Sequence, residues 1–469
     1  MATSFRTLFD HQRSAFESGP AVPSDERIRR LRRLRAALLE QRPAIRKALY
    51  RDFRKPAHEV DATEVAPIAI EIDHAIRHLH EWVKPQRHGA PRFLPGTSWE
   101  TRLEPRGPSL ILAPWNYPIN LTLGPLVHAL AAGCPVFIKP SEHTPHASAL
   151  VADLLGSLFA PEDVVVVQGD AETAQGLLEL PFRHVYFTGS PAVGQKVMAA
   201  AARHLASVTL ELGGKSPAIV DDTADLADAA SKIVFGKFAN AGQTCIAPDY
   251  VLVHESVHDA LVAALIDEIS TSYGDMPAAR RASPDYARLV SHTHFDRMCA
   301  LLDNATTRGA HIAFGGTNAQ EERFFEPTLL TSVPDDTTVL REEIFGPLLP
   351  ILPYRTESDI LSRLRTYDPP LSAYVFTDND ALADRLGSLV RTGAVCQNET
   401  LLHFVNPEVA FGGMGASGVG RGHGHAGFLA FSNEQLVMRR RFGSAITKQL
   451  HPPYGRKTSI LVDWLMKLS

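Results

Sequence analysis

The spacing of apolar side chains divides the chain into a helical beginning and a longer part in which strands and helices alternate. Residues 24–54 carry apolar side chains at helical spacing, with a break at Pro43, and residues 60–82 predict a second helix. From residue 109 onward, short apolar runs bounded by turns are typical of buried strands. The first five predicted strands are Ser109–Ala113, Val136–Lys139, Val164–Gln168, His184–Thr188 and Val208–Glu211.

Helical segments separate these strands, which predicts a parallel sheet covered by helices on both faces. The clearest of these helices are Leu121–Ala132, Ala147–Leu158 and Val193–His204. A second α/β section runs from 216 to 393, with predicted helices at Ala224–Phe238, Val257–Ser270 and Ala381–Val390. Its predicted strands include Tyr250–His254, His311–Phe314, Leu348–Leu352 and Leu371–Phe376. Ligands of such sheets bind at the carboxyl ends of the strands.

Composition narrows the class of protein. The chain has 469 residues and a net charge of −5, so it can form two or three domains but has no charge excess that would attract nucleic acid. Its four cysteines are scattered and form no CxxC pair, and the His292/His294 and His423/His425 pairs lack a third ligand, so we predict neither a disulfide framework nor a metal site. The N-terminus has no apolar core for a signal peptide, and we expect the reducing cytoplasm.

A turn, a carboxylate and a cysteine follow one another in the middle of the chain. Gly189 and Gly194 frame a turn between a strand and a helix, which can hold a phosphate, although a plain tight turn has the same pattern. Glu211 stands in an apolar strand, where burial suits a general base, and a structural salt bridge to Lys215 is an equal alternative. Cys245 follows small residues that would let a substrate approach, whereas most free cysteines are inert core residues.

Polar residues at other strand ends add to this picture. Asn116 stands between two prolines in a stiff turn, where its amide could donate to an oxyanion or form an Asx turn. Lys139 and Glu142 follow the next strand, where the hydroxyl groups of a ribose could lie. Each of these signals is weak on its own.

Taken in order, the motifs resemble those of the aldehyde dehydrogenase superfamily. The resemblance runs from about residue 10 to the C-terminus. The segments Gln243–Tyr250 and Pro452–Tyr454 are similar to the class 3 branch, which includes enzymes that oxidise fatty and aromatic aldehydes. The seven motifs that carry the resemblance are the Asn116 turn, Lys139–Glu142, Gly189–Ser190, Glu211–Pro217, Gly242–Cys245, Glu342–Pro347 and Phe411–Gly418.

The resemblance implies a mechanism. The Cys245 thiolate attacks the aldehyde carbon, Asn116 and the Cys245 backbone N–H hold the oxyanion, a hydride passes to the nicotinamide, and Glu211 activates water to hydrolyse the thioester. NAD is the implied cofactor and NADP the alternative, because the Glu142 carboxylate near the 2′ position would repel a phosphate there. The implied cofactor-binding residues are Trp115, Lys139, Glu142, Gly189, Ser190, Gly194, Leu212, Glu343 and Phe345.

The resemblance and the strand pattern together predict an α/β fold in three parts. Residues 1–211 form a Rossmann-like parallel-sheet domain that binds NAD(P), and residues 394–425 return to it. Residues 212–393 form a second α/β domain, which carries the catalytic cysteine. Residues 94–107 and 426–446 form a small β oligomerisation arm. We expect a homodimer through the strands Ser98–Leu103 and Gln435–Arg439.

Three functions stay open at this point. The first is hydrolytic oxidation of a hydrophobic aldehyde, aliphatic or aromatic; the second is a CoA-acylating aldehyde dehydrogenase, against which Glu211 argues because that branch typically lacks this base. The third is a non-enzymatic binding or structural protein on the same scaffold. Ala426 stands where class 3 usually has a histidine beside the substrate mouth. We expect the amphipathic tail 460–468 to pack on the protein's own surface, in preference to touching a membrane or gating the tunnel of a partner subunit.

Overall fold

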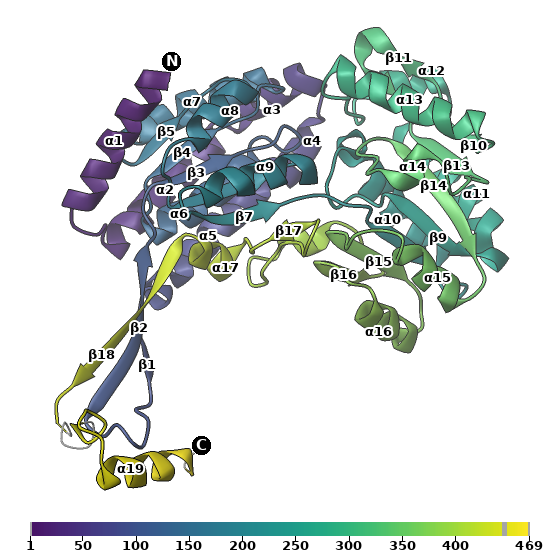
Figure 1. The fold of residues 1–469 in the computed structure, drawn as a ribbon. Helices are drawn as coiled ribbons and strands as arrows, with labels where there is room; N and C mark the ends of the chain where they lie inside the picture. The colour runs from purple at the N-terminus through teal and green to yellow at the C-terminus, as the bar shows by residue number, and fades with distance from the viewer. Residues whose placement is uncertain (1, 443–447, 468–469) are drawn as a thin grey trace.

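Two large β-sheets and a projecting three-stranded arm organise the chain (Figure 1). The structure is a computed structural model, and it describes residues 2–442 and 448–467. The break in the first predicted helix falls at Gln41, because Pro43 is tolerated in the first turn of the helix that follows. The chain begins with α1 (Ala2–Ser18), α2 (Ser24–Glu40), α3 (Arg42–Phe53), α4 (Ala57–Val60), the π-helical turn η1 (Asp61–Val65) and α5 (Ala66–Trp82).

The first sheet has the strand order β17-β7-β6-β3-β4-β5. Its strands pair in parallel except for β17, which runs antiparallel to β7. Because β3 is followed on one side by β4 and on the other by β6, the carboxyl ends of β3 and β6 flank a topological switch point, where ligands bind in such sheets. The strands are β3 (Ser109–Leu112), β4 (Val136–Lys139), β5 (Val164–Val166), β6 (His184–Thr188), β7 (Ser207–Glu211) and β17 (Gly418–Val419). The helices beside them are α6 (Asn120–Ala132), α7 (Pro145–Leu158), α8 (Ala171–Leu178) and α9 (Pro191–Ala202).

The second sheet has the order β10-β13-β14-β9-β8-β15-β16. All neighbours are parallel except β10, which is antiparallel to β13. Its strands are β8 (Pro217–Val220), β9 (Tyr250–His254), β10 (His311–Phe314), β13 (Thr328–Thr331), β14 (Leu348–Tyr354), β15 (Ser372–Phe376) and β16 (Ala394–Gln397). Its helices are α10 (Leu226–Phe238), α11 (His258–Tyr273), α12 (Pro277–Ala282), α13 (His292–Thr307), α14 (Thr338–Arg341), α15 (Glu357–Leu364) and α16 (Asp380–Leu389), and β11 (Asn318–Ala319) pairs with β12 (Phe324–Phe325). The α/β prediction is confirmed.

The predicted return of the chain to the first sheet at residue 394 is wrong at its start. Residues Ala394–Gln397 form β16 and pair in parallel with β15, so they extend the second sheet. The return begins further along, at β17, whose Gly418 pairs with Glu211. A pattern of alternating exposure in β16 identifies a strand but not the sheet that it joins.

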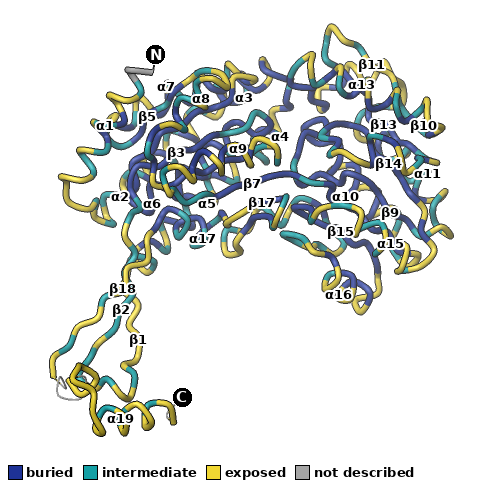
Figure 2. The backbone as a smooth tube through the Cα atoms, viewed as in Figure 1, coloured by how far each residue is buried: buried dark blue, intermediate teal, exposed yellow. Residues whose placement is uncertain are grey.

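The arm consists of β1 (Gln86–His88), β2 (Thr97–Pro105) and β18 (Ser432–Arg440), in the order β1-β2-β18. β18 runs antiparallel to β2 over its whole length. Figure 2 shows the arm as mostly half-buried or exposed, in contrast to the dark core of the two sheets. The predicted arm segment 426–446 begins too early, because Gly424–Ala430 form α17 on the main body, and residues 443–446 lie outside the described part of the chain.

Helix α19 (Arg456–Met466) lies at the end of the arm (Figure 1). None of its residues is buried, and Ile460 and Trp464 are 59% and 47% exposed. The expected packing of this tail on the protein's own surface is therefore not seen in the described residues, and residue 468 of the tail lies outside them. No helix in ranges 2–442 and 448–467 is long and apolar enough to cross a bilayer.

Candidate active site

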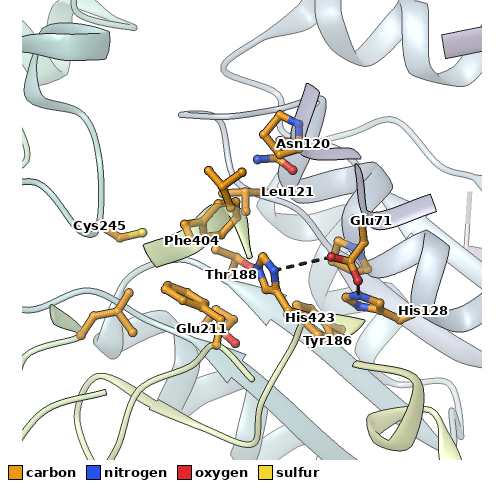
Figure 3. A pocket seen from close by; sticks show the side chains of 16 residues that line it. Glu71, Asn120, Leu121, His128, Tyr186, Thr188, Glu211, Cys245, Phe404 and His423 are labelled. Atoms are coloured by element: carbon orange, nitrogen blue, oxygen red, sulfur yellow. Dashed lines mark hydrogen bonds and ion pairs between the residues drawn. The ribbon is translucent and has the colours of Figure 1, made fainter. Parts of the chain in front are cut away.

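Two cavities meet between the sheets, and three residues line both of them: Thr188, Glu211 and Cys245. The larger cavity, of about 1040 Å³, extends along the carboxyl ends of β3, β4 and β6. The smaller one lies between α5, α6 and the segment before β17 (Figure 3). A sulfur atom and a carboxylate thus stand where the two spaces join.

Glu211 is the last residue of β7 and is only 7% exposed. Its main chain is fixed by Gly418 of β17 and by the Gly189 N–H, which donates to the Glu211 carbonyl at 3.0 Å. Neither carboxyl oxygen has a hydrogen-bond partner among residues 2–442 and 448–467, and burial raises the pKa of Glu211 to about 8 against the opposing effect of Arg421. A carboxyl group that titrates near neutrality suits a general base.

The alternative interpretation of Glu211, a salt bridge to Lys215, is wrong. The Lys215 ammonium donates instead to the Asp249 carboxylate and to the carbonyl oxygens of Val339 and Glu342. Lys215 is therefore satisfied inside the second sheet's domain, and the Glu211 carboxyl group faces the cavities without it.

Cys245 follows a 3₁₀ turn, η2 (Ala239–Gly242), in which Asn240 and Ala241 both have positive φ angles of 55° and 53°. This left-handed backbone turns the chain sharply after α10 and presents the cysteine to the cavities. Burial, with smaller effects of Glu343 and Glu211, raises the pKa of the Cys245 thiol to about 12. The thiol is therefore protonated at neutral pH in this arrangement, and its attack on a carbonyl group requires a base.

Asn116 follows β3 and lies against the cysteine loop. Its side-chain amide donates to the Gln243 carbonyl at 3.1 Å, and Asn240 donates to the Asn116 carbonyl at 2.9 Å. The side chain is 3% exposed and lines the larger cavity together with Cys245. The structure thus brings Asn116, Glu211 and Cys245 to one place from three elements far apart in sequence.

Seven of the nine residues expected to bind a cofactor line the larger cavity: Trp115, Lys139, Glu142, Gly189, Ser190, Glu343 and Phe345. Gly189 and Ser190 precede α9, whose N-terminus offers free backbone N–H groups to a phosphate. Lys139 donates to Glu142 at 2.5 Å, and the Trp115 and Phe345 rings meet edge to face at 5.3 Å. Burial and the nearby Asp249 raise the pKa of Glu343 to about 8.

Gly194 and Leu212 do not line this cavity. They pack against each other in its wall, where a Cβ atom at Gly194 would lie 2.8 Å from the Leu212 side chain. Gly194 therefore lets α9 approach β7 closely. Gly194 and Leu212 can affect a bound cofactor only indirectly, by fixing the position of the Gly189–Ser190 turn.

Comparison with known proteins places this geometry in a family. The sequence pattern of the aldehyde dehydrogenase family matches residues 2–437. The chain belongs to this family. It is 41% identical over 432 residues to the 4,4'-diaponeurosporen-aldehyde dehydrogenase of Staphylococcus aureus, with 92% of each chain covered. It is 36% identical over 453 residues to aldehyde dehydrogenase family 3 member B2 of Mus musculus, covering 96% of this chain and 93% of the relative.

Solved structures agree with this assignment. A substrate-bound AldH of Staphylococcus aureus superposes with a TM-score of 0.92 at 38% identity, covering 98% of this chain and 99% of that one. An NAD+ complex of an aldehyde dehydrogenase from Bacillus cereus has a TM-score of 0.86 at 28% identity, covering 94% and 89%. The protein is an aldehyde dehydrogenase, and the non-enzymatic alternative is set aside.

In this aldehyde dehydrogenase the smaller cavity contains a polar cluster that the sequence did not reveal. Glu71 of α5 accepts a hydrogen bond from His128 of α6 at 2.8 Å and lies 3.6 Å from His423 (Figure 3). Burial would raise the pKa of Glu71, but His128, His423 and the Gly424 N–H lower it to about 2, so it is ionised. The rest of the lining is mainly apolar, with Leu121, Leu371, Phe404, Val405 and Phe411. Three distant elements build this cluster, and only His423 lies in a pattern visible in the sequence, the His423/His425 pair.

Proposed function

We propose that the enzyme oxidises a hydrophobic aldehyde, aliphatic or aromatic, to its carboxylic acid, with NAD as the preferred acceptor. The observation that carries the proposal is the junction of the two cavities at Cys245 and Glu211. The aldehyde enters from the smaller cavity, whose walls are mainly apolar, and the cofactor lies in the larger one. Only at the junction can a carbonyl carbon lie near the sulfur and the nicotinamide together.

The pKa values support different roles for Glu211 and Cys245, as base and nucleophile. Glu211, with a pKa of about 8, accepts the proton of the Cys245 thiol as the sulfur attacks the carbonyl carbon. The Asn116 amide and the Cys245 backbone N–H donate to the oxygen that becomes negative. NAD, when bound, supplies the acceptor for the hydride. Glu211 first releases the thiol proton to solvent, and as a carboxylate again it takes a proton from the water that attacks the thioester on Cys245 and releases the acid.

The larger cavity fits a dinucleotide. The turn before α9 is kept narrow at Gly189, where a Cβ atom would lie 2.5 Å from the Phe187 ring, and the first residues of α9, Pro191–Val193, line the cavity, so the helix N-terminus faces the space for a phosphate. The Lys139–Glu142 pair lies where ribose hydroxyl groups are to be held. We rank NAD before NADP because of the Glu142 carboxylate, although its bond to Lys139 weakens the repulsion of a 2′-phosphate.

We also infer a homodimer that forms through the arms. β18 lies at the edge of the three-stranded sheet, where β2 is its one neighbouring strand in the described part of the chain, and sheet edges of this kind pair with other chains. Leu436 and Phe442 of the arm are 64% and 68% exposed, which is unusual for large apolar side chains without a partner.

A comparison of Cys245→Ser with Cys299→Ser tests the catalytic assignment. Cys299 is a half-buried cysteine of α13 that lines neither cavity, so its substitution should leave turnover unchanged. Cys245→Ser should stop formation of reduced nicotinamide with straight-chain and aromatic aldehydes, while calorimetry still detects NAD binding. Undiminished turnover of Cys245→Ser would refute the assignment. Acyl-CoA formation on addition of CoA would favour the acylating alternative.

A further inference from the structure

A group of potential metal ligands lies outside both cavities. His74 and His78 stand one turn apart on α5, and Glu408 approaches them from the segment after the 3₁₀ turn η5 (Leu402–Val405). The His74 Nδ1 atom lies 3.3 Å from Glu408 Oε1, and His78 Nε2 lies 3.8 Å from the same oxygen. Within residues 2–442 and 448–467, these form the one group of three such side chains whose ligand atoms all lie within 4.8 Å.

The spacing of these atoms suits a tetrahedral ion better than it suits a hydrogen bond. Zinc with bonds of about 2.0–2.1 Å holds its ligand atoms roughly 3.3–3.5 Å apart. The two distances to Glu408 match that spacing within a few tenths of an ångström, and the ligand atoms of all three side chains lie within 4.8 Å of one another, so the histidine nitrogen atoms have to close around an ion. The His78 Nε2 atom is buried and has no hydrogen-bond partner in the described chain, so it faces the group unsatisfied.

The surroundings hold the two histidine rings in place. His74 is 5% exposed, its ring lies 4.5 Å from that of His78, and both rings pack against Trp82. The Glu408 side chain is 63% exposed, and only its backbone is fixed, by an N–H that donates to the Asn406 side chain at 3.0 Å. The two histidines therefore lose little conformational freedom when an ion binds, and Glu408 is the ligand that has to be ordered.

We propose that His74, His78 and Glu408 bind a divalent transition metal ion, with zinc as the best match and water as the fourth ligand. Two imidazole nitrogens and one carboxylate oxygen form a donor set that zinc accepts readily. The ion would cross-link two walls of the aldehyde cavity. Helix α5 contributes Glu71 to that cavity, and η5 contributes Phe404 and Val405, so the metal holds these walls at a fixed separation.

The proposal does not depend on the catalytic assignment and is tested by binding. The untagged full-length chain with Cys245→Ser, which removes a competing thiol, is treated with a chelator and titrated with Zn²⁺ in a calorimeter. We expect one high-affinity ion per chain. Substitution of a residue outside the first coordination sphere typically lowers metal affinity by roughly 10–100-fold. His78→Ala and Glu408→Gln each remove a ligand, so each should lower the zinc affinity by more than that. His80→Ala is the matched control, because His80 lies on the same helix but pairs with Asp25, and it should bind zinc normally.

A spectroscopic readout separates this site from loose binding to other histidines. Co²⁺ in a tetrahedral site absorbs strongly in the visible range, and the band should appear in the parent chain and in His80→Ala but be lost in His78→Ala. Zinc should raise Tm in the same two proteins only. Absence of a high-affinity ion, or equal binding and equal Tm shifts in His78→Ala, would overturn the proposal and leave the group as a polar contact between Glu408 and the two histidines.

Discussion

Replacing Glu211 with glutamine tests the most costly feature of the site, a buried carboxyl group whose oxygens have no hydrogen-bond partner. Burial raises its pKa from the ordinary 4.5 to about 8. The folded protein therefore holds this proton more tightly than the unfolded chain does. The contribution of this tightly held proton to the free energy of unfolding is fully present below pH 4.5. It is lost as the pH rises through about 8, where the buried carboxylate forms.

The difference between 4.5 and about 8 corresponds to about 5 kcal/mol of unfolding free energy, at about 1.36 kcal/mol per pH unit. Water that enters the cavity lowers this value, so it is an upper bound. Glutamine keeps the shape without the charge. Near pH 5 the two proteins should be similar in stability, and above pH 8 the variant should be more stable. For 469 residues an unfolding entropy of roughly 2.1 cal/mol/K per residue converts this to at most about 5 °C in Tm.

Scanning calorimetry of both proteins without cofactor, at about pH 5 and about pH 8.5, measures this difference. Glu343 has a similarly raised pKa, but it is present in both proteins and its effect cancels in the comparison. The same variant should lose turnover, because the base is gone. A Tm difference that is the same at both pH values, or a variant less stable at the higher pH, would refute the reasoning.

Three further outcomes follow from the site and the arm. Asn116→Ala should lower kcat by about 10²–10³-fold in steady-state kinetics, and an unchanged kcat would exclude an oxyanion role. Gly213→Ala should weaken NAD binding in equilibrium dialysis, because a Cβ atom there would overlap the Glu343 carboxylate; equal affinity would separate Glu343 from the cofactor. Leu436→Asp on the exposed arm should give a monomer in analytical ultracentrifugation, whereas a persisting dimer would place the interface elsewhere.

The sequence predicts elements well where the pattern is local. The strands Tyr250–His254 and His311–Phe314 match at both ends, since each apolar run is bounded by turns. The strands Pro217–Val220 and Thr328–Thr331 were not predicted. The sheet to which β16 belongs depends on tertiary packing, which no local pattern contains.

The site was predictable to the extent that its residues sit in motifs. Proximity in sequence suggested that Lys215 neutralises Glu211, but Gly213 and Gly214 redirect the chain between them, and Lys215 reaches Asp249 instead. The Glu71–His128–His423 cluster joins residues 57 and more positions apart, and the His423/His425 pair gave no indication that Glu71 and His128 are its partners. The spacing of His74 and His78 was a visible signal, yet its third member, Glu408, is known only from the fold.

The pairing of β2 with β18 has a consequence for how the protein is made. Arg439 of β18 donates to Glu100 of β2, which leaves the ribosome 339 positions earlier. During most of translation β2 therefore has no partner on that side, and its open edge is exposed to other nascent chains. We therefore expect the arm to fold only after the chain is released from the ribosome. The yield of native enzyme should then depend more on chaperones and on crowding between nascent chains than it does for a protein whose paired strands are close together in sequence.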